Sequence, residues 1–171
     1  RRFAAELVDE DFGGEGGDPK NAEIYFELRN AELKVAYPVF VDGREIDRSG
    51  YVDEVNRRSE LGKLMLDSDF LDKMVVNRYW AHFLGYGFTK PIDDLGPHNS
   101  PSHPDLLDYL GKEIRKNSYN LKELMRWITL SEAYSLSSRT NPSNDLADDP
   151  LLGEMPKFSR FYLRHMQAEQ L

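Results

Sequence analysis

The sequence contains no cysteine among its 171 residues. Disulfide bonds, thiolate metal sites, cysteine nucleophiles and CxxCH attachment of haem are therefore excluded within this chain. It also has no apolar run near the ~18 residues that a membrane-spanning helix requires. Lys and Arg number 22 against 30 Asp and Glu, and the net charge of −8 argues against nucleic acid as a partner. We therefore expect no membrane span and no nucleic-acid partner.

Familiar catalytic motifs are missing as well. The chain has no glycine-rich phosphate loop, no HExxH helix and no GxSxG elbow. Ser131, Ser137 and Ser138 lie near a predicted helix end, and a serine within a helix usually bonds back to a backbone carbonyl. Nucleophilic catalysis is therefore not expected, and His82 is expected to be a partly buried core histidine.

The length and the composition, with 40% hydrophobic and 30% charged residues, are those of one globular domain. Residues 1–20 are predicted to be an N-terminal extension with a glycine-rich linker, GGEGGDP, and residues 21–171 a single mainly helical domain. The chain starts at Arg1 and ends in a predicted helix, 158–171, without a stop signal. We therefore expect a fragment of a larger protein.

Alternating apolar residues predict one β-hairpin near the N-terminus. Ile24, Phe26 and Leu28 alternate with polar residues, and Leu33, Val35 and Tyr37 do so again after a short polar turn. A lone hairpin is marginal in water, so it needs a neighbour.

Helical patterns fill most of the remaining chain. Residues 52–66 predict an amphipathic helix, and residues 69–84 a helix that is apolar on almost every side and therefore central. Asp67 or Ser68 is the predicted N-cap of the central helix, and Gly85 its C-terminal cap.

Two further helix starts are sharply marked. Ser102, followed by Pro104 and an acid, predicts a capped helix over 103–116, and Asn120 opens a second capping box that predicts a helix over 121–136. With the predicted helix at 158–171, the fold class is mainly α: about five helices in an irregular bundle with one N-terminal β-hairpin.

One cluster of charges stands out around the central helix. Arg78 lies midway along it, and two adjacent carboxylates, Asp93 and Asp94, follow in the next loop. A buried guanidinium needs a carboxylate partner, so we expect an ion pair that ties the loop to the helix. A binding cleft built from the same residues is the alternative, because such sites often hold perturbed carboxylates.

The loop also suggests a metal site, with Asp93, Asp94, His98 and His103 close together in the sequence. Their spacing matches no recognised metal motif, so we expect no metal and no cofactor in this chain. His103 lies at a helix start, where a neutral, hydrogen-bonded ring is expected. The simpler interpretation is a loop held by side-chain hydrogen bonds to its own backbone.

Four segments, taken in order, resemble a known family. They are VNRYWAHFLGYGFTKPIDDLG, SPSHPDLLDYLGKEI, LKELMRWITLSEAYSLSS and RHMQAEQL. This set is similar to the planctomycete-specific C-terminal domain of unknown function called PSD, over roughly residues 37–171. Leu84 stands at the first glycine position of the family's FGxG turn, which is a departure.

The resemblance implies a large extracytoplasmic protein, in the periplasm or cell envelope, in which this domain follows other domains and often a cytochrome-like module. It also implies one clustered centre, made of Asn77, Arg78, Trp80, Asp93, Asp94 and His103.

Two hypotheses for function follow. The first is a non-catalytic structural or interaction module that docks on upstream domains of its own polypeptide, or on a redox or envelope protein. The second is a carbohydrate-directed hydrolase domain centred on Arg78, Asp93, Asp94 and His103. An open polar pocket at this centre favours the enzyme, and a filled, dry centre favours the module.

Overall fold

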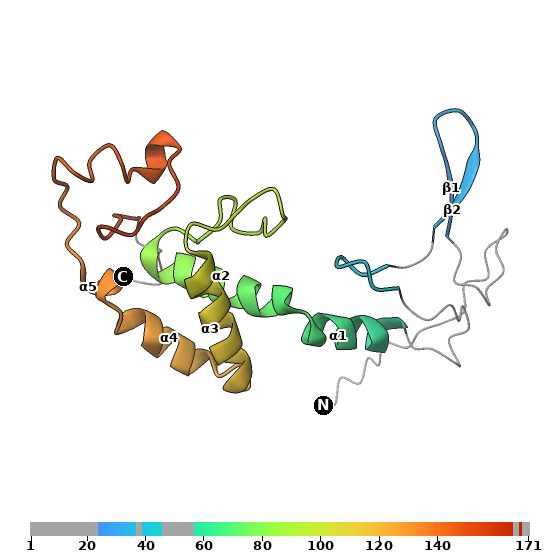
Figure 1. Ribbon diagram of the computed structural model, residues 1–171, viewed down its shortest axis with the longest axis horizontal. Coiled ribbons are helices and arrows are strands. Elements are labelled where there is room, and N and C mark those ends of the chain that lie inside the picture. The colour runs from blue at the N-terminus through green and yellow to red at the C-terminus, as the bar shows by residue number, and fades with distance from the viewer. Residues whose placement is uncertain (1–23, 37–38, 46–56, 166–167, 169–171) are drawn as a thin grey trace. The chain divides into compact units, whose positions relative to one another are not determined.

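The computed structural model describes residues 24–36, 39–45, 57–165 and 168 (Figure 1). The chain divides into two compact units, Arg1–Asp67 and Ser68–Leu171, and each is considered by itself. The predicted extension and linker over residues 1–20 lie outside the described residues. In the part of the chain that is described, no helix is both long and apolar enough to cross a membrane.

The first unit contains the predicted β-hairpin. Strands β1 (Ile24–Glu27) and β2 (Leu33–Ala36) pair antiparallel, with Ile24 opposite Ala36 and Glu27 opposite Leu33. Ala31 takes a left-handed backbone conformation, with φ of 64°, and its N–H donates to the Leu28 carbonyl to close the turn. The expected hairpin is confirmed.

Helix α1 (Arg57–Asp67) ends the first unit. The start of the helix predicted over residues 52–66 lies outside the described residues. Every residue of this unit whose exposure is described is exposed or only partly buried, which includes Phe26, Leu33 and Val41. The residues of this unit whose exposure is described therefore contribute no buried core.

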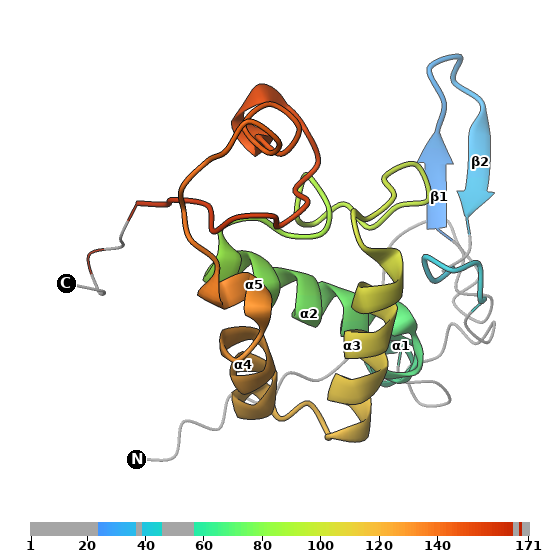
Figure 2. The ribbon, with the colours of Figure 1, turned by 60° about the vertical axis from the view of Figure 1, so that its left-hand side comes forward.

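The second unit is built around the central helix α2 (Asp69–Leu84), as predicted. The Ser68 hydroxyl accepts a hydrogen bond from the Phe70 N–H at its start, and Gly85, with φ of 90°, caps its end in the left-handed region that favours glycine. Helices α3 (Pro104–Lys116), α4 (Leu121–Thr129) and α5 (Glu132–Ser135) all contact α2 (Figure 2).

The core of this unit lies where α2, α3 and α4 meet a loop and the C-terminal segment. Its buried members are all apolar or aromatic: Val76, Trp80, Leu84, Phe88, Leu107, Leu110, Ile114, Leu124, Ile128, Phe158 and Tyr162. Gly111 on α3 permits close packing on α2, because a Cβ there would lie 3.2 Å from the Asp72 Cβ.

Two of the predicted helices differ in detail from the helices of the structure. The residue that caps α3 is His103 rather than Ser102, because Pro104 occupies the first helical position and the Leu107 N–H already bonds the His103 carbonyl. The helix predicted over residues 121–136 is split into α4 and α5. Ser131 is extended at the break, and its hydroxyl bonds the Ile128 carbonyl at 2.7 Å.

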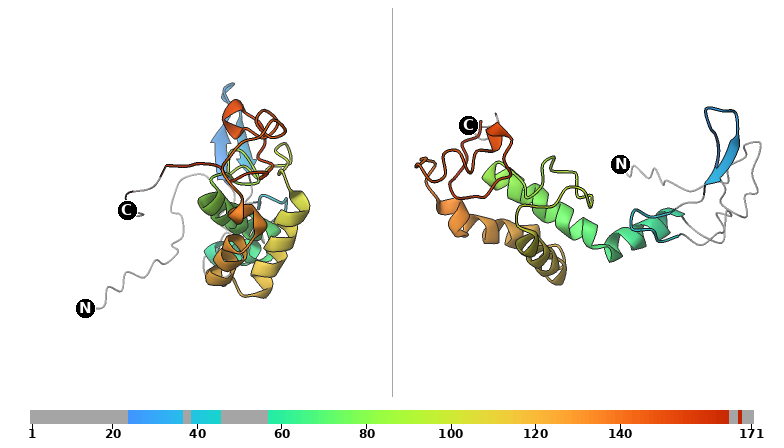
Figure 3. Two further views of the ribbon diagram at one scale, coloured as in Figure 1. Left: turned by 90° about the vertical axis from the view of Figure 1, so that its left-hand side faces the viewer. Right: turned by 45° about the horizontal axis from the view of Figure 1, so that its top comes forward.

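The prediction of a helix over residues 158–171 is wrong, because residues 158–165 form no helix. Phe158 has a φ of 54°, which is incompatible with a helix, and its ring inserts into the core with that of Tyr162. This segment (red in Figures 2 and 3) passes the end of α2, where the Arg164 guanidinium donates to the His82 carbonyl.

Candidate functional site

Asn77 is the most tightly held residue of the predicted centre. It is fully buried on α2, and its side-chain amide nitrogen donates to the Thr89 hydroxyl at 2.8 Å and to the Ile92 carbonyl at 2.9 Å. Its carbonyl oxygen accepts the Phe88 N–H at 2.6 Å. A Cβ at Gly87 would lie only 2.7 Å from that oxygen, so this close approach requires glycine. Asn77 therefore fixes the loop that follows α2.

Trp80 and His103 belong to the aromatic core beside this loop. Trp80 is stacked on Phe88 with ring centroids 4.6 Å apart and meets Phe158 edge-on at 5.5 Å. The His103 ring lies 5.7 Å from that of Phe158, and its Nδ1 is 3.0 Å from the Ser102 hydroxyl. The expected hydrogen-bonded ring at the helix start is thus found. The centre around Asn77 and Trp80 is filled.

Arg78 lies on the surface, contrary to the expectation of a buried guanidinium. Its Nη2 is 2.6 Å from Asp93 Oδ1, and the two side chains are 57% and 67% exposed. Because α2 is apolar all round, its sequence does not show which side faces solvent, and position 78 faces outward. An exposed pair of this kind contributes only ~0–1 kcal/mol to stability.

Asp94 does not pair with Arg78 but organises its own loop. Its carboxylate accepts the Gly96 N–H at 3.1 Å and lies 2.9 Å from His98 Nε2. The Gly96 N–H is the main cause, with His98 second, of an Asp94 pKa below its usual value. The Asn99 amide adds a bond to the Asp94 carbonyl at 2.9 Å. The loop is therefore held by side-chain hydrogen bonds to its own backbone, as the simpler interpretation predicted.

The candidate metal ligands do not converge. Asp94 and His98 are in contact, whereas His103 packs in the aromatic core and Asp93 faces Arg78. Within the described ranges, no three His, Cys, Asp or Glu side chains are placed to hold a metal ion.

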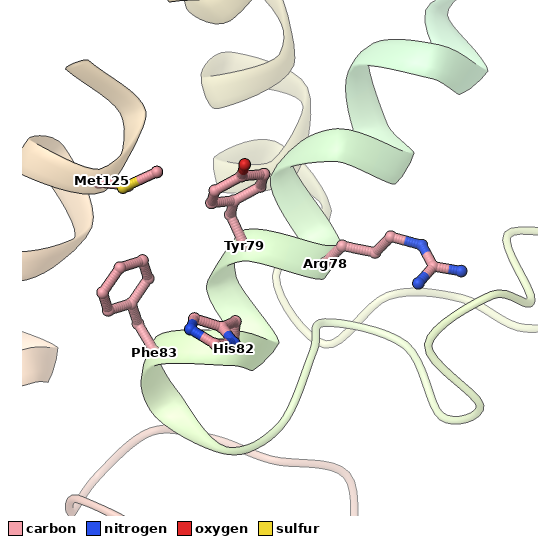
Figure 4. A pocket seen from close by; sticks show the side chains of 5 residues that line it. All are labelled: Arg78, Tyr79, His82, Phe83 and Met125. Atoms are coloured by element: carbon pink, nitrogen blue, oxygen red, sulfur yellow. The ribbon is translucent and has the colours of Figure 1, made fainter. Parts of the chain in front are cut away.

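A surface pocket of about 380 Å³ lies between α2 and α4 (Figure 4). It is lined by Arg78, Tyr79, His82 and Phe83 from α2 and by Met125 from α4. Arg78 is the one member of the predicted centre that lines it. The pocket was not predicted from the sequence, because it depends on which face of α2 meets α4.

Comparison with known protein families gives a match over most of the chain. Residues 57–171 match the family PSD1, described as a protein of unknown function (DUF1553). The chain belongs to this family. The match covers the second unit and α1, and it starts later than the resemblance noted from residue 37. No curated protein and no solved structure matches the chain.

Two buried carboxylates within this PSD1 segment were missed by the sequence analysis. Asp72 on α2 accepts bonds from Arg115 Nε at 2.8 Å and from the Tyr119 hydroxyl at 2.6 Å. Burial and the bond to Asp72 raise the pKa of Tyr119. The partners are more than 40 residues away in the sequence, so no local pattern identifies them.

Asp148 is the second missed carboxylate, and it organises the C-terminal segment. It accepts the Lys157 N–H at 2.8 Å, the Ser159 N–H at 2.9 Å and both the Ser159 and Tyr162 hydroxyls. Burial alone would raise the pKa of Asp148, but these hydrogen bonds outweigh it and lower the pKa. Burial and the bond to Asp148 raise the pKa of Tyr162. The acceptor capacity of Asp148 is therefore used by its own chain, and the carboxylate fixes the C-terminal segment.

Proposed function

We propose that this PSD1 domain is a non-catalytic interaction module that docks on other domains of a larger polypeptide. The observation that carries the proposal is a folded loop in which polar side chains are buried and leucine side chains are exposed. In the leucine loop (residues 144–153), the polar residues Asn144 and Asp148 are buried, whereas Leu146, Leu151 and Leu152 are 76%, 85% and 68% exposed. Exposed apolar groups on a fixed scaffold are typical of a protein interaction site.

The leucine loop is held in shape by its own hydrogen bonds. Asn144 Oδ1 accepts the Asn141 N–H at 2.8 Å, and Asp149 caps the 3₁₀ helix η2 (Pro150–Leu152) through the Leu151 N–H. Lys90 Nζ bonds the Pro150 carbonyl at 2.8 Å. Because this loop is already ordered, it loses little conformational entropy when its leucines bind a partner.

The predicted centre supports a non-catalytic role. Asn77 uses its whole amide to hold the loop after α2, Trp80 packs in the core, and the partly buried His103 ring lies against Phe158. Arg78 and Asp93 form an exposed pair away from this core. The part of the centre around Asn77 and Trp80 is filled, whereas Arg78 lines the pocket between α2 and α4. Of the other residues that the hydrolase alternative needs, Asp94 is bonded within its own loop and the His103 ring lies against Phe158, which favours the module.

The proposed partner is another domain of the same polypeptide, with an apolar groove rimmed by basic residues. The leucine loop carries the exposed or partly buried acids Asp145 and Asp149, and Glu154 follows it. Complementary charge would orient the contact. The family resemblance further supports an extracytoplasmic protein and a cytochrome-like module, or another redox or envelope protein, as neighbours.

Hydrogen–deuterium exchange on the product of the intact gene tests this proposal. We expect amides of residues 144–153 to exchange about tenfold more slowly in the intact polypeptide than in the 171-residue chain. The double substitution Leu151→Ser and Leu152→Ser should remove that difference. Leu130→Ser, at a 73% exposed leucine outside the loop, is the matched control and should leave it unchanged.

Two results would overturn the proposed docking. One is equal exchange of the leucine loop in both proteins, and the other is a gene product no longer than the chain. Protection that survives the double substitution would show that the contact lies elsewhere.

A further inference from the structure

The pocket between α2 and α4 is lined mainly by aromatic rings and a thioether. Tyr79, His82 and Phe83 come from α2, and the Met125 side chain of α4 lies across the pocket from Phe83 (Figure 4). Ligand sites in proteins are mostly apolar with a few polar groups, and their volumes begin at about 300 Å³. At about 380 Å³, this pocket suits a ligand with a single ring.

The pocket offers no free charge to a ligand. Of its lining residues, Arg78 alone carries a permanent charge, and its guanidinium reaches away from Phe83 and Met125 toward the loop after α2 (Figure 4). One guanidinium nitrogen pairs with Asp93 at 2.6 Å. A charged ligand would lose its water without gaining an opposite charge, so the pocket favours a neutral ligand.

His82 supplies a polar group with unused hydrogen-bonding capacity. It is exposed, contrary to the expectation of a partly buried core histidine. Its ring contacts that of Phe83 edge-on at 5.2 Å, and among the described residues the ring takes part in no hydrogen bond or ion pair. One of its two ring nitrogens lies on the side nearer Phe83 (Figure 4). A ligand can therefore bond His82 without breaking a hydrogen bond in the described part of the protein.

We propose that this pocket binds a small neutral phenol. The ring of the ligand lies against Phe83 and Met125, where aromatic and sulfur contacts are favourable. The hydroxyl of the ligand donates a hydrogen bond to the unprotonated nitrogen of the neutral His82 ring. The tautomer of a histidine is set by the bond that its other nitrogen makes, and since no described residue makes such a bond, His82 can present this nitrogen to the pocket. The site is separate from the leucine loop, so it stands or falls independently of the proposed docking role.

Titration of the 171-residue chain followed by amide NMR tests the site, with 4-methylphenol as the probe. We expect saturable shifts confined to residues 78–84 and 121–127, with a dissociation constant on the order of 1 mM for a ligand of this size. Methoxybenzene, an isomer of the probe, should bind about fivefold more weakly, because it has no hydroxyl to donate. The charged analogue 4-methylbenzoate should also bind more weakly than the probe, because nothing in the pocket offsets its desolvation.

Three variants separate the roles of the lining residues. His82→Phe keeps a ring but removes the acceptor nitrogen, so it should weaken binding of 4-methylphenol to the level of methoxybenzene and leave methoxybenzene unaffected. Met125→Ser should weaken both ligands, because it removes part of the apolar lining. His98→Phe makes the same substitution at an exposed histidine outside the pocket and should change neither.

Each contrary result overturns the proposal. Shifts that fail to saturate below roughly 20 mM would exclude a site of this affinity. Shifts that saturate elsewhere on the chain would place the ligand outside the pocket. Equal binding of 4-methylphenol and methoxybenzene, or loss of 4-methylphenol binding in His98→Phe, would exclude recognition by His82. Tighter binding of 4-methylbenzoate than of 4-methylphenol would show that the site does not select a neutral ligand.

Discussion

Two neighbouring residues of α2, Asn77 and Arg78, differ greatly in what they contribute to the fold. Asn77 is fully buried and bonds three groups of the following loop, whereas Arg78 makes one exposed ion pair with Asp93. A buried polar group that loses its partner costs ~1–3 kcal/mol. An exposed ion pair contributes ~0–1 kcal/mol, because water and salt screen it.

We therefore predict that Asn77→Ala lowers the free energy of unfolding by about 3 kcal/mol, because it leaves the buried Phe88 N–H without a partner and removes the bonds that Asn77 donates to Thr89 and Ile92. Arg78→Ala should lower it by less than about 1 kcal/mol. Urea denaturation followed by circular dichroism measures both. Equal losses in the two variants would show that the ion pair contributes more than its exposure implies.

The identity of these residues was predictable from the sequence, but their environments were not. Asn77, Arg78 and Trp80 were singled out together, and the structure divides them between the core and the surface. An amphipathic helix reveals its buried face by its period, but α2 is apolar on almost every side. Which polar residue is buried was decided by the positions of α3, α4 and the loop.

At the scale of the element, local sequence patterns predicted the helix caps correctly. Ser68 and Gly85 cap α2, and Asn120 caps α4 through the Lys122 and Glu123 N–H groups, as predicted. These contacts join residues within a few positions of each other. The C-terminal segment was predicted wrongly because Asp148, which holds it, lies nine to fourteen residues before its partners.

Asp148 makes the stability of the C-terminal segment dependent on pH. Its pKa is lowered in the folded protein, so the unfolded chain binds more protons at acidic pH. The contribution of Asp148 is therefore fully present above the unfolded value of about 4 and is lost as the pH falls through the lower folded value.

We predict that Asp148→Asn is less stable than wild type at pH 7 and that the difference shrinks as the pH is lowered from 5 toward 2, roughly the range over which the carboxylate protonates. Thermal melts across that range measure the difference. Asp145→Asn, at an exposed position in the same loop, is the control and should change little at any pH. If Asp148→Asn remains less stable than wild type at low pH, the shape of the side chain, and not the charge of the carboxylate, accounts for the loss of stability.

At the scale of the whole molecule, every buried hydrophobic residue among those described lies between Val76 and Tyr162. Among the residues before Ser68 whose exposure is described, none is buried. The matched PSD1 segment, residues 57–171, contains this whole core. Since burial of apolar surface is the dominant favourable contribution to folding, the segment should carry the stability of the second unit.

We predict that a fragment of residues 57–171 unfolds in one cooperative transition, with a melting temperature within about 5 °C of the full chain, a shift equivalent to ~1 kcal/mol for a domain of this size. Calorimetry of both proteins provides the comparison. Asn77→Ala should lower the melting temperature equally in fragment and full chain, because its partners all lie inside the fragment. A fragment that melts without a cooperative transition would show that residues 1–56 complete the core. The family boundary would then not be a folding boundary.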